Sequence, residues 1–187
     1  MEKMGLRGLP LSDVILDDVR IPAENVMGGA EVSFNELKRL MTFGKLCLAA
    51  QCLGIMQASL EESVKYANTR MHFDKPIIKL RPIRWLLAEM ASRLEASRRL
   101  TYHAAYVKEQ DGDVDEMIRD VAICKLFVTQ TAVDVARMGV EIHGSYGLIK
   151  DYKMERLFRD AKMYELLEGS AEIQRELIAP RVARQYA

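Results

Sequence analysis

The sequence predicts an all-α protein: an up-and-down four-helix bundle with an additional C-terminal helix and a short β-rich N-terminal arm. Three long segments place apolar residues three and four positions apart, which is the spacing of one buried helix face. A loop bracketed by Pro76 and Pro82, and an Asp-Gly-Asp turn at 111–113, separate these segments. Long amphipathic helices with short connections pack antiparallel, and this predicts the bundle.

The first 29 residues differ from the rest of the chain. Ser12–Leu16 and Val19–Ile21 have the composition of short strands, and Pro22 ends the second of them. Two short strands do not form a stable sheet by themselves. We therefore interpret residues 1–29 as the trailing edge of a larger β-domain with its linker, and residues 30–187 as the helical bundle domain.

The apolar spacing and the turn residues also predict where each helix begins and ends. In the third helix, Lys125 falls on the same stripe as the apolar residues. The simplest interpretation is that its ammonium reaches the rim of the bundle, and a functional contact is the alternative. The helices are expected at about Glu31–Met71, Ile83–Gln110, Val114–Ile142, Met154–Leu166 and Ser170–Gln185.

Composition excludes several classes of function. The 187 residues include 27 basic and 27 acidic side chains without a basic stripe, so a nucleic-acid partner is not expected. No apolar run approaches the roughly 20 residues of a membrane span, and the N-terminus lacks the apolar region of a signal peptide. Three cysteines without CxxC spacing indicate reduced, mostly buried thiols in a cytoplasmic protein. No Glu-x-x-His pair is present, so no metal site is expected.

The last third of the chain holds the candidate chemistry. Three runs follow one another: EIHGSYG from Glu141, ERLFRDAK from Glu155 and LLEGSAEIQ from Leu167. Glu168 precedes Gly169 and Ser170, where a helix should begin. One interpretation is structural, because a serine caps a helix start and an acid suits its positive end. The other is a general base for C–H abstraction, which needs an apolar cleft to bring its pKa near the working pH.

Four motifs in order resemble the acyl-CoA dehydrogenase family, from Met4 to the end of the chain. MGLRGLPLSDVILDDVRIPAENVMGG resembles the end of the family's middle β-domain and its link to the C-terminal bundle. YANTRMHFDKPI is similar to the loop Tyr-Ala-x-x-Arg-x-x-Phe-Gly-x-Pro-Ile, and RPIRWLLAEMA to the helix start after it. The fourth motif is the C-terminal run. The resemblance implies an FAD-dependent enzyme that introduces a double bond between the α- and β-carbons of an acyl-CoA thioester.

Carried over position by position, the resemblance also implies roles for individual residues. Glu168 would take the α-proton while the β-hydrogen passes as hydride to the flavin. Residues implied to contact the cofactor are Arg70, Phe73, Arg81, Glu141, Gly144, Ser145, Ser170 and Glu172. Residues implied to lie near the substrate are Phe43, Gly44, Lys45 and Gly169.

Several of these positions depart from the family pattern. Asp74 replaces the usual loop glycine, Ser145 the second glycine of a Gly-Gly pair, and Lys45 an arginine. Arg81 and Glu141 stand where glutamine is common. None of these changes removes the proposed base. The acyl group accepted is not predicted, because much of the acyl cavity would lie in other segments of the family fold.

The resemblance does not extend to the family's N-terminal helical domain or to most of its β-domain. The chain alone is therefore expected to be inactive and to need other segments or a partner chain. Family members imply acyl-CoA as substrate, electron-transfer flavoprotein as electron acceptor, and a homodimer or homotetramer. The alternative is a non-catalytic oligomerisation module, or a partner subunit of the same ancestry, that depends on another chain for flavin.

Overall fold

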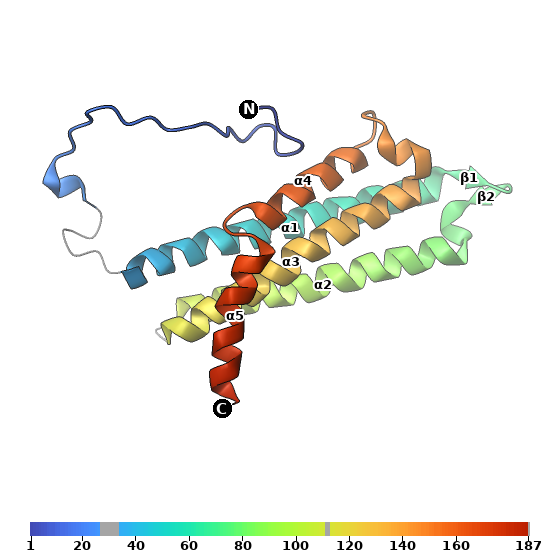
Figure 1. The fold of residues 1–187 in the computed structure, drawn as a ribbon. Helices are drawn as coiled ribbons and strands as arrows, with labels where there is room; N and C mark the ends of the chain where they lie inside the picture. The colour runs from blue at the N-terminus through green and yellow to red at the C-terminus, as the bar shows by residue number, and fades with distance from the viewer. Residues whose placement is uncertain (27–33, 111–112, 187) are drawn as a thin grey trace.

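The computed structural model describes residues 1–26, 34–110 and 113–186, and these form a helical bundle with an irregular N-terminal arm (Figure 1). The elements, in order, are η1 (Ala23–Asn25), α1 (Phe34–Thr69), β1 (Met71–His72), β2 (Lys75–Pro76), η2 (Ile77–Lys79), α2 (Arg81–Glu109), α3 (Val114–His143), η3 (Gly144–Leu148), α4 (Met154–Leu166) and α5 (Ala171–Gln185).

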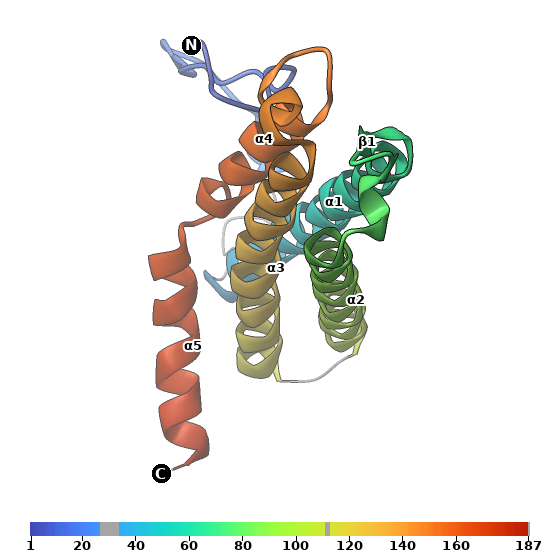
Figure 2. The same ribbon diagram turned by 90° about the vertical axis from the view of Figure 1, so that its right-hand side faces the viewer.

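Helix α3 is the centre of the molecule. Helices α1 and α2 pack against one side of it, and α4 and α5 lie along other sides (Figures 1 and 2). Its inward positions, among them Val121, Val128 and Val135, are completely buried and recur at the helical spacing. Met56 of α1 and Met90 of α2 fill the space against them and are also completely buried. The predicted up-and-down bundle is confirmed.

The helix ends follow from local chemistry. Asp113 caps α3, because its Oδ1 accepts a hydrogen bond from the Asp115 N–H at 2.9 Å. Helix α2 begins at Arg81, two residues before the predicted start, since Pro82 is tolerated in a first turn. Gly144 ends α3 with φ +58°, a conformation that favours glycine. The start predicted for the first helix and the hinge at Gly28-Gly29 lie outside the described residues.

The prediction of a β-rich arm is wrong for the part of the arm that the structure describes. Residues 10–22 form no strand and are exposed, because a strand needs a partner for its backbone groups and none lies beside it here. The arm instead lies against α4: the Leu6 N–H donates to Asp160 Oδ1 at 2.6 Å, and Arg159 donates to the Met4 carbonyl. Within the described ranges, the two strands lie elsewhere, in a hairpin that pairs Met71 with Pro76.

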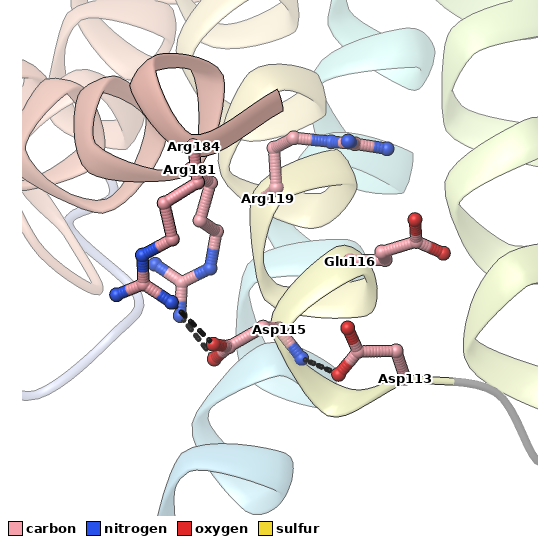
Figure 3. A pocket seen from close by; sticks show the side chains of 6 residues that line it. All are labelled: Asp113, Asp115, Glu116, Arg119, Arg181 and Arg184. Carbon is pink, nitrogen blue, oxygen red and sulfur yellow. Dashed lines mark hydrogen bonds and ion pairs between the residues drawn. The ribbon is translucent and has the colours of Figure 1, made fainter. Parts of the chain in front are cut away.

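Helix α5 is held against the start of α3 by ion pairs (Figure 3). Arg181 donates to Asp115 Oδ1 at 2.7 Å, and Arg184 lies 3.4 Å from Asp115 Oδ2. Because the shared Asp115 is 46% exposed, each pair is expected to contribute about 0–1 kcal/mol, so the pairs orient α5 more than they stabilise it.

One segment, Leu40–Thr69 in α1, is long and apolar enough to cross a membrane by length and composition, which the sequence analysis did not anticipate. This is weak support for a span, because the central helix of a globular bundle meets the same criteria. In α1, Ala49, Cys52 and Met56 are completely buried against other helices. The apolar residues of this helix are thus used, at least in part, in the core.

Candidate functional site

The loop between α4 and α5 carries Glu168 in an unusual backbone conformation. Glu168 has φ +54° and Gly169 has φ +94°. A non-glycine residue in the left-handed region costs about 1–2 kcal/mol and persists where the surrounding structure determines it. Such residues are concentrated at functional sites, which favours the interpretation of Glu168 as more than a helix-start acid.

The carboxylate of Glu168 faces α1 at Gly44. A β-carbon at Gly44 would lie 3.1 Å from Glu168 Cδ and 3.2 Å from each carboxylate oxygen, so a larger residue would force the carboxylate to move. Lys45 follows on α1 with only 5% of its surface exposed. Burial lowers the pKa of the Lys45 ammonium from its ordinary value, and attraction to Glu168 opposes this shift. The structure thus places Gly44, Lys45 and Glu168 close together, and the roles that the resemblance implies for them stay predictions.

Two buried side chains that the resemblance did not assign hold this loop. Lys125 Nζ donates to the carbonyls of Glu165 at 2.9 Å and Gly169 at 2.7 Å. Gln174 of α5 donates from Nε2 to the same Gly169 carbonyl at 3.0 Å. The expectation that Lys125 reaches the rim is wrong, since it is 1% exposed. The position of Lys125 on an apolar stripe of α3 was the sequence signal that could have identified it as buried.

Ser170 and Glu172 lie at the start of α5, beyond this loop. Ser170 is the N-cap residue of α5, without a side-chain capping bond to the backbone. A hydrogen bond from Ser170 lowers the pKa of the Glu172 carboxyl below its ordinary value. Ser170 and Glu172 therefore contact each other at the start of α5, two and four residues after Glu168 in the sequence.

A second group of residues, which includes the predicted Arg70, lies near the C-terminal end of α3. The Arg70 guanidinium sits 5.3 Å from the centre of the Tyr146 ring. The Tyr66 ring stacks on His143 at 4.2 Å, and Tyr152 contacts both rings edge-on. Burial lowers the pKa of His143 from its ordinary value. These side chains line a hollow of about 420 Å³ that also borders Glu62 and Lys65.

The remaining predicted cofactor residues lie near the same end of the bundle, but most are exposed or paired with other side chains. Gly144 and Ser145 follow directly on α3, and both are exposed. Phe73 is 78% exposed at the tip of the β1–β2 hairpin. Arg81 stacks over Trp85, and Glu141 pairs with Arg137. Trp85 itself is 65% exposed.

The hairpin accounts for one departure from the family pattern. Phe73 and Asp74 are its two central residues, with φ +49° and +57°. A two-residue hairpin turn of this kind requires positive φ at both positions, which glycine adopts at least cost and aspartate tolerates. Asp74 thus keeps the turn that a glycine would make.

The two groups are far apart in one chain. Gly144 lies 19 residues after Lys125 on α3 (144 minus 125), which corresponds to about 28 Å at a rise of about 1.5 Å per residue. Phe43 lies with the first group, on α1 next to Gly44, and Lys108 of α2 covers its ring at 5.5 Å. The predicted cofactor contacts of a single chain are therefore divided between two places.

Two other hollows are less suited to binding a cofactor or an acyl-CoA. The hollow in Figure 3, about 390 Å³, is lined by three acidic and three basic side chains whose charges balance. A hollow of about 640 Å³ lies between the arm, α1 and α4, next to Tyr164 and Leu167. In the ranges that the structure describes, no three His, Cys, Asp or Glu side chains form a group that could hold a metal ion.

The profile of the family described as "Acyl-CoA dehydrogenase, C-terminal domain" matches residues 34–183. The chain belongs to the acyl-CoA dehydrogenase family. It is 37% identical over 183 residues to the 3-(aryl)acrylate reductase of Clostridium sporogenes, covering 98% of this chain and 48% of that protein. It is 34% identical to the caffeyl-CoA reductase–Etf complex subunit CarC of Acetobacterium woodii, covering 95% and 46%.

Among solved structures, butyryl-CoA dehydrogenase from Megasphaera elsdenii superposes with a TM-score of 0.90 at 33% identity, covering 98% of this chain and 47% of that one. The acyl-CoA dehydrogenase fold of the bundle is thereby confirmed. This chain spans about half the length of the relatives it matches.

The residues of the second group suit part of a dinucleotide such as FAD. The exposed Arg70 guanidinium could bind a phosphate, and the Tyr146 ring beside it could stack on a planar base. A β-carbon added at Gly144 would meet no atom within 4 Å, so this backbone is open to a ligand. Among the described residues of this chain, Arg70, Gly144 and Ser145 have the chemistry that fits the phosphate part of such a cofactor.

Proposed function

We propose that this chain is the C-terminal part of the active site of an FAD-dependent enzyme that oxidises an acyl-CoA thioester to the α,β-enoyl-CoA. The observation that carries the proposal is the Glu168 carboxylate packed against Gly44, at 3.2 Å from the position of its missing β-carbon. Glycine at 44 leaves a narrow space in which a substrate carbon can approach the carboxylate.

In this proposal Glu168 accepts the proton from the α-carbon. A bound flavin would accept the hydride that leaves the β-carbon with both electrons of its C–H bond, and the two electrons of the broken Cα–H bond would form the new double bond. Lys45 places a positive charge near the carboxylate and the thioester. Gly169 allows the backbone to approach the substrate closely, and Glu168 is exposed in the chain by itself. The apolar enclosure that such a base needs must then come from other segments or another chain.

The reverse reaction is the second candidate. The relatives from C. sporogenes and A. woodii are both named reductases, and the second is a subunit of a complex with Etf. The same residues serve both directions, with Glu168 donating its proton to the α-carbon during reduction. We propose electron-transfer flavoprotein as the electron partner in either direction.

The test is co-expression of this chain with the N-terminal half of a family member, which supplies the segments that the chain does not span. A yellow complex that bleaches when a saturated acyl-CoA is added without oxygen supports the oxidation. Glu168→Gln should bind the same flavin and lose at least about 10²-fold in bleaching rate, the usual effect of a general base. The matched control is Glu176→Gln, which removes another exposed carboxylate from the same region.

Three outcomes separate the candidates. Reoxidation of a reduced complex by an enoyl-CoA much faster than its reduction by the acyl-CoA favours the reductase. A complex that assembles without flavin indicates the oligomerisation module. Full bleaching in Glu168→Gln removes Glu168 from the proposed role.

A further inference from the structure

Lys125 is the largest side chain that is fully buried in the part of the chain that the structure describes. Transfer of an ammonium out of water is costly unless hydrogen bonds and opposite charge offset it. Burial lowers the pKa of Lys125 from its ordinary value, while Glu165, Glu168 and the Cys52 side chain oppose this shift and Lys45 adds to it. A methionine would fill this position at less cost, so the ammonium itself needs an explanation.

The carbonyl groups around Nζ provide one. Helix α4 ends at Leu166, so the Glu165 carbonyl is one of its last four and has no partner within the helix. A cation at this end also meets the negative pole of the helix dipole. The second carbonyl, of Gly169, lies beyond the helix in the loop and accepts the shorter bond, 2.7 Å against 2.9 Å.

That second bond distinguishes a simple helix cap from a positioning role. A residue that only capped α4 would have no need to reach Gly169. Gln174 of α5 is completely buried and donates to the same carbonyl. A β-carbon at Gly169 would lie 3.0 Å from that amide nitrogen, so the loop fits closely between Lys125 and Gln174.

We propose that Lys125 is a positioning residue: through the Gly169 carbonyl, it holds the loop so that the Glu168 carboxylate faces Gly44. The loop has two successive residues with positive φ, a conformation that persists only where its surroundings fix it. The ammonium links helix α3 to the carbonyl of Gly169, the residue directly after Glu168. The catalytic meaning of this contact rests on the proposed function, but the contact can be tested independently of it.

The test is amide hydrogen exchange, measured by mass spectrometry on peptides that cover residues 166–174 of the purified chain. Lys125→Met keeps an unbranched side chain that is one atom shorter than lysine and removes both bonds. Exchange in these peptides should accelerate about tenfold or more, as expected when a charge-assisted hydrogen bond is lost. Peptides from α2 should exchange as in the wild type. Lys125→Arg retains a cation with several donors and should restore part of the protection.

Val128→Ala is the matched control, because it removes buried methyl groups one turn further along α3 without touching the loop. It should lower stability while leaving residues 166–174 no more affected than the rest of the bundle. Unchanged exchange at 166–174 in Lys125→Met would overturn the proposal. An acceleration spread evenly over all helices, as in Val128→Ala, would also overturn it.

In the co-expressed flavin complex, the positioning role predicts a further result. Lys125→Met should lower kcat about tenfold or more with little change in KM, because the misplaced carboxylate affects proton transfer more than substrate binding. A complex that binds flavin without bleaching would refute the proposed reaction and leave the exchange result intact. If hydrogen exchange at residues 166–174 accelerates in Lys125→Met but kcat does not change, Lys125 is only a structural cap of the helix.

Discussion

Gly169 is the residue whose backbone most restricts the base loop. With φ +94° and a β-carbon position 3.0 Å from Gln174 Nε2, Gly169→Ala should destabilise the chain by about 1–3 kcal/mol. The matched control is Gly54→Ala, inside α1, where an added β-carbon meets nothing within 4 Å. Alanine there should stabilise the helix by about 0.5–1 kcal/mol.

Urea denaturation followed by circular dichroism measures both glycine variants. Opposite shifts of the two midpoints are expected, with Gly169→Ala moving to lower urea. Equal shifts would mean that the loop relaxes freely and that its conformation is not fixed by Lys125 and Gln174.

At the scale of single residues, the resemblance named candidate residues, and the structure shows the surroundings of each. Glu168, Gly44 and Lys45 were predicted and are close together. The burial of Lys125 was not predicted, because a lysine on an apolar stripe can reach either water or an internal acceptor. Only the fold determines which one, since the acceptors belong to residues 40 and 44 positions away in sequence.

Among the elements, the N-terminal arm is the one whose docking depends on a single small residue. A β-carbon at Gly5 would lie 2.3 Å from the Arg159 carbonyl oxygen, a backbone atom that cannot move aside. Gly5→Ala should therefore release residues 4–6 from α4 and break the hydrogen bond between Leu6 and Asp160. Trypsin should then cleave after Arg7 faster than in the wild type.

Gly8→Ala is the control for the arm, because an added β-carbon there meets nothing within 4 Å. Its cleavage rate should match the wild type, and the circular dichroism of both variants should stay the same. Equal cleavage of the two variants would show that the arm is not held by α4 in solution.

Element boundaries were predictable where local chemistry sets them, and not where a partner does. Met154–Leu166 was predicted at both ends, as were the start of α3 at Val114 and the end of α5 at Gln185. The remaining described helix ends differ by one or two residues. The apolar spacing and the cap residues are local signals, so the sequence contains them. The strands expected at Ser12–Leu16 and Val19–Ile21 could form only if another strand paired with them. The sequence of a segment does not reveal whether such a partner lies beside it.

For the whole molecule, the balance of apolar surface and ligand contacts predicts self-association without flavin. Large apolar side chains on α1 and α2 are half-exposed or more, including Phe43, Trp85, Tyr102 and Tyr106. Exposed apolar groups of this kind drive association between copies. The predicted cofactor contacts lie in two groups about 28 Å apart along α3, so one chain offers each FAD few contacts to offset the entropy of binding.

Sedimentation of the purified chain, read at the protein band and at the flavin band, tests both parts of this prediction. We expect a colourless dimer or tetramer, with added FAD bound weakly. Replacement of both Tyr102 and Tyr106 by Glu places two like charges one turn apart on this surface and should shift the chain toward the monomer. A wild-type monomer that carries stoichiometric flavin would contradict the prediction. It would mean that the residues around Arg70 and around Glu168 bind a cofactor without a neighbouring subunit.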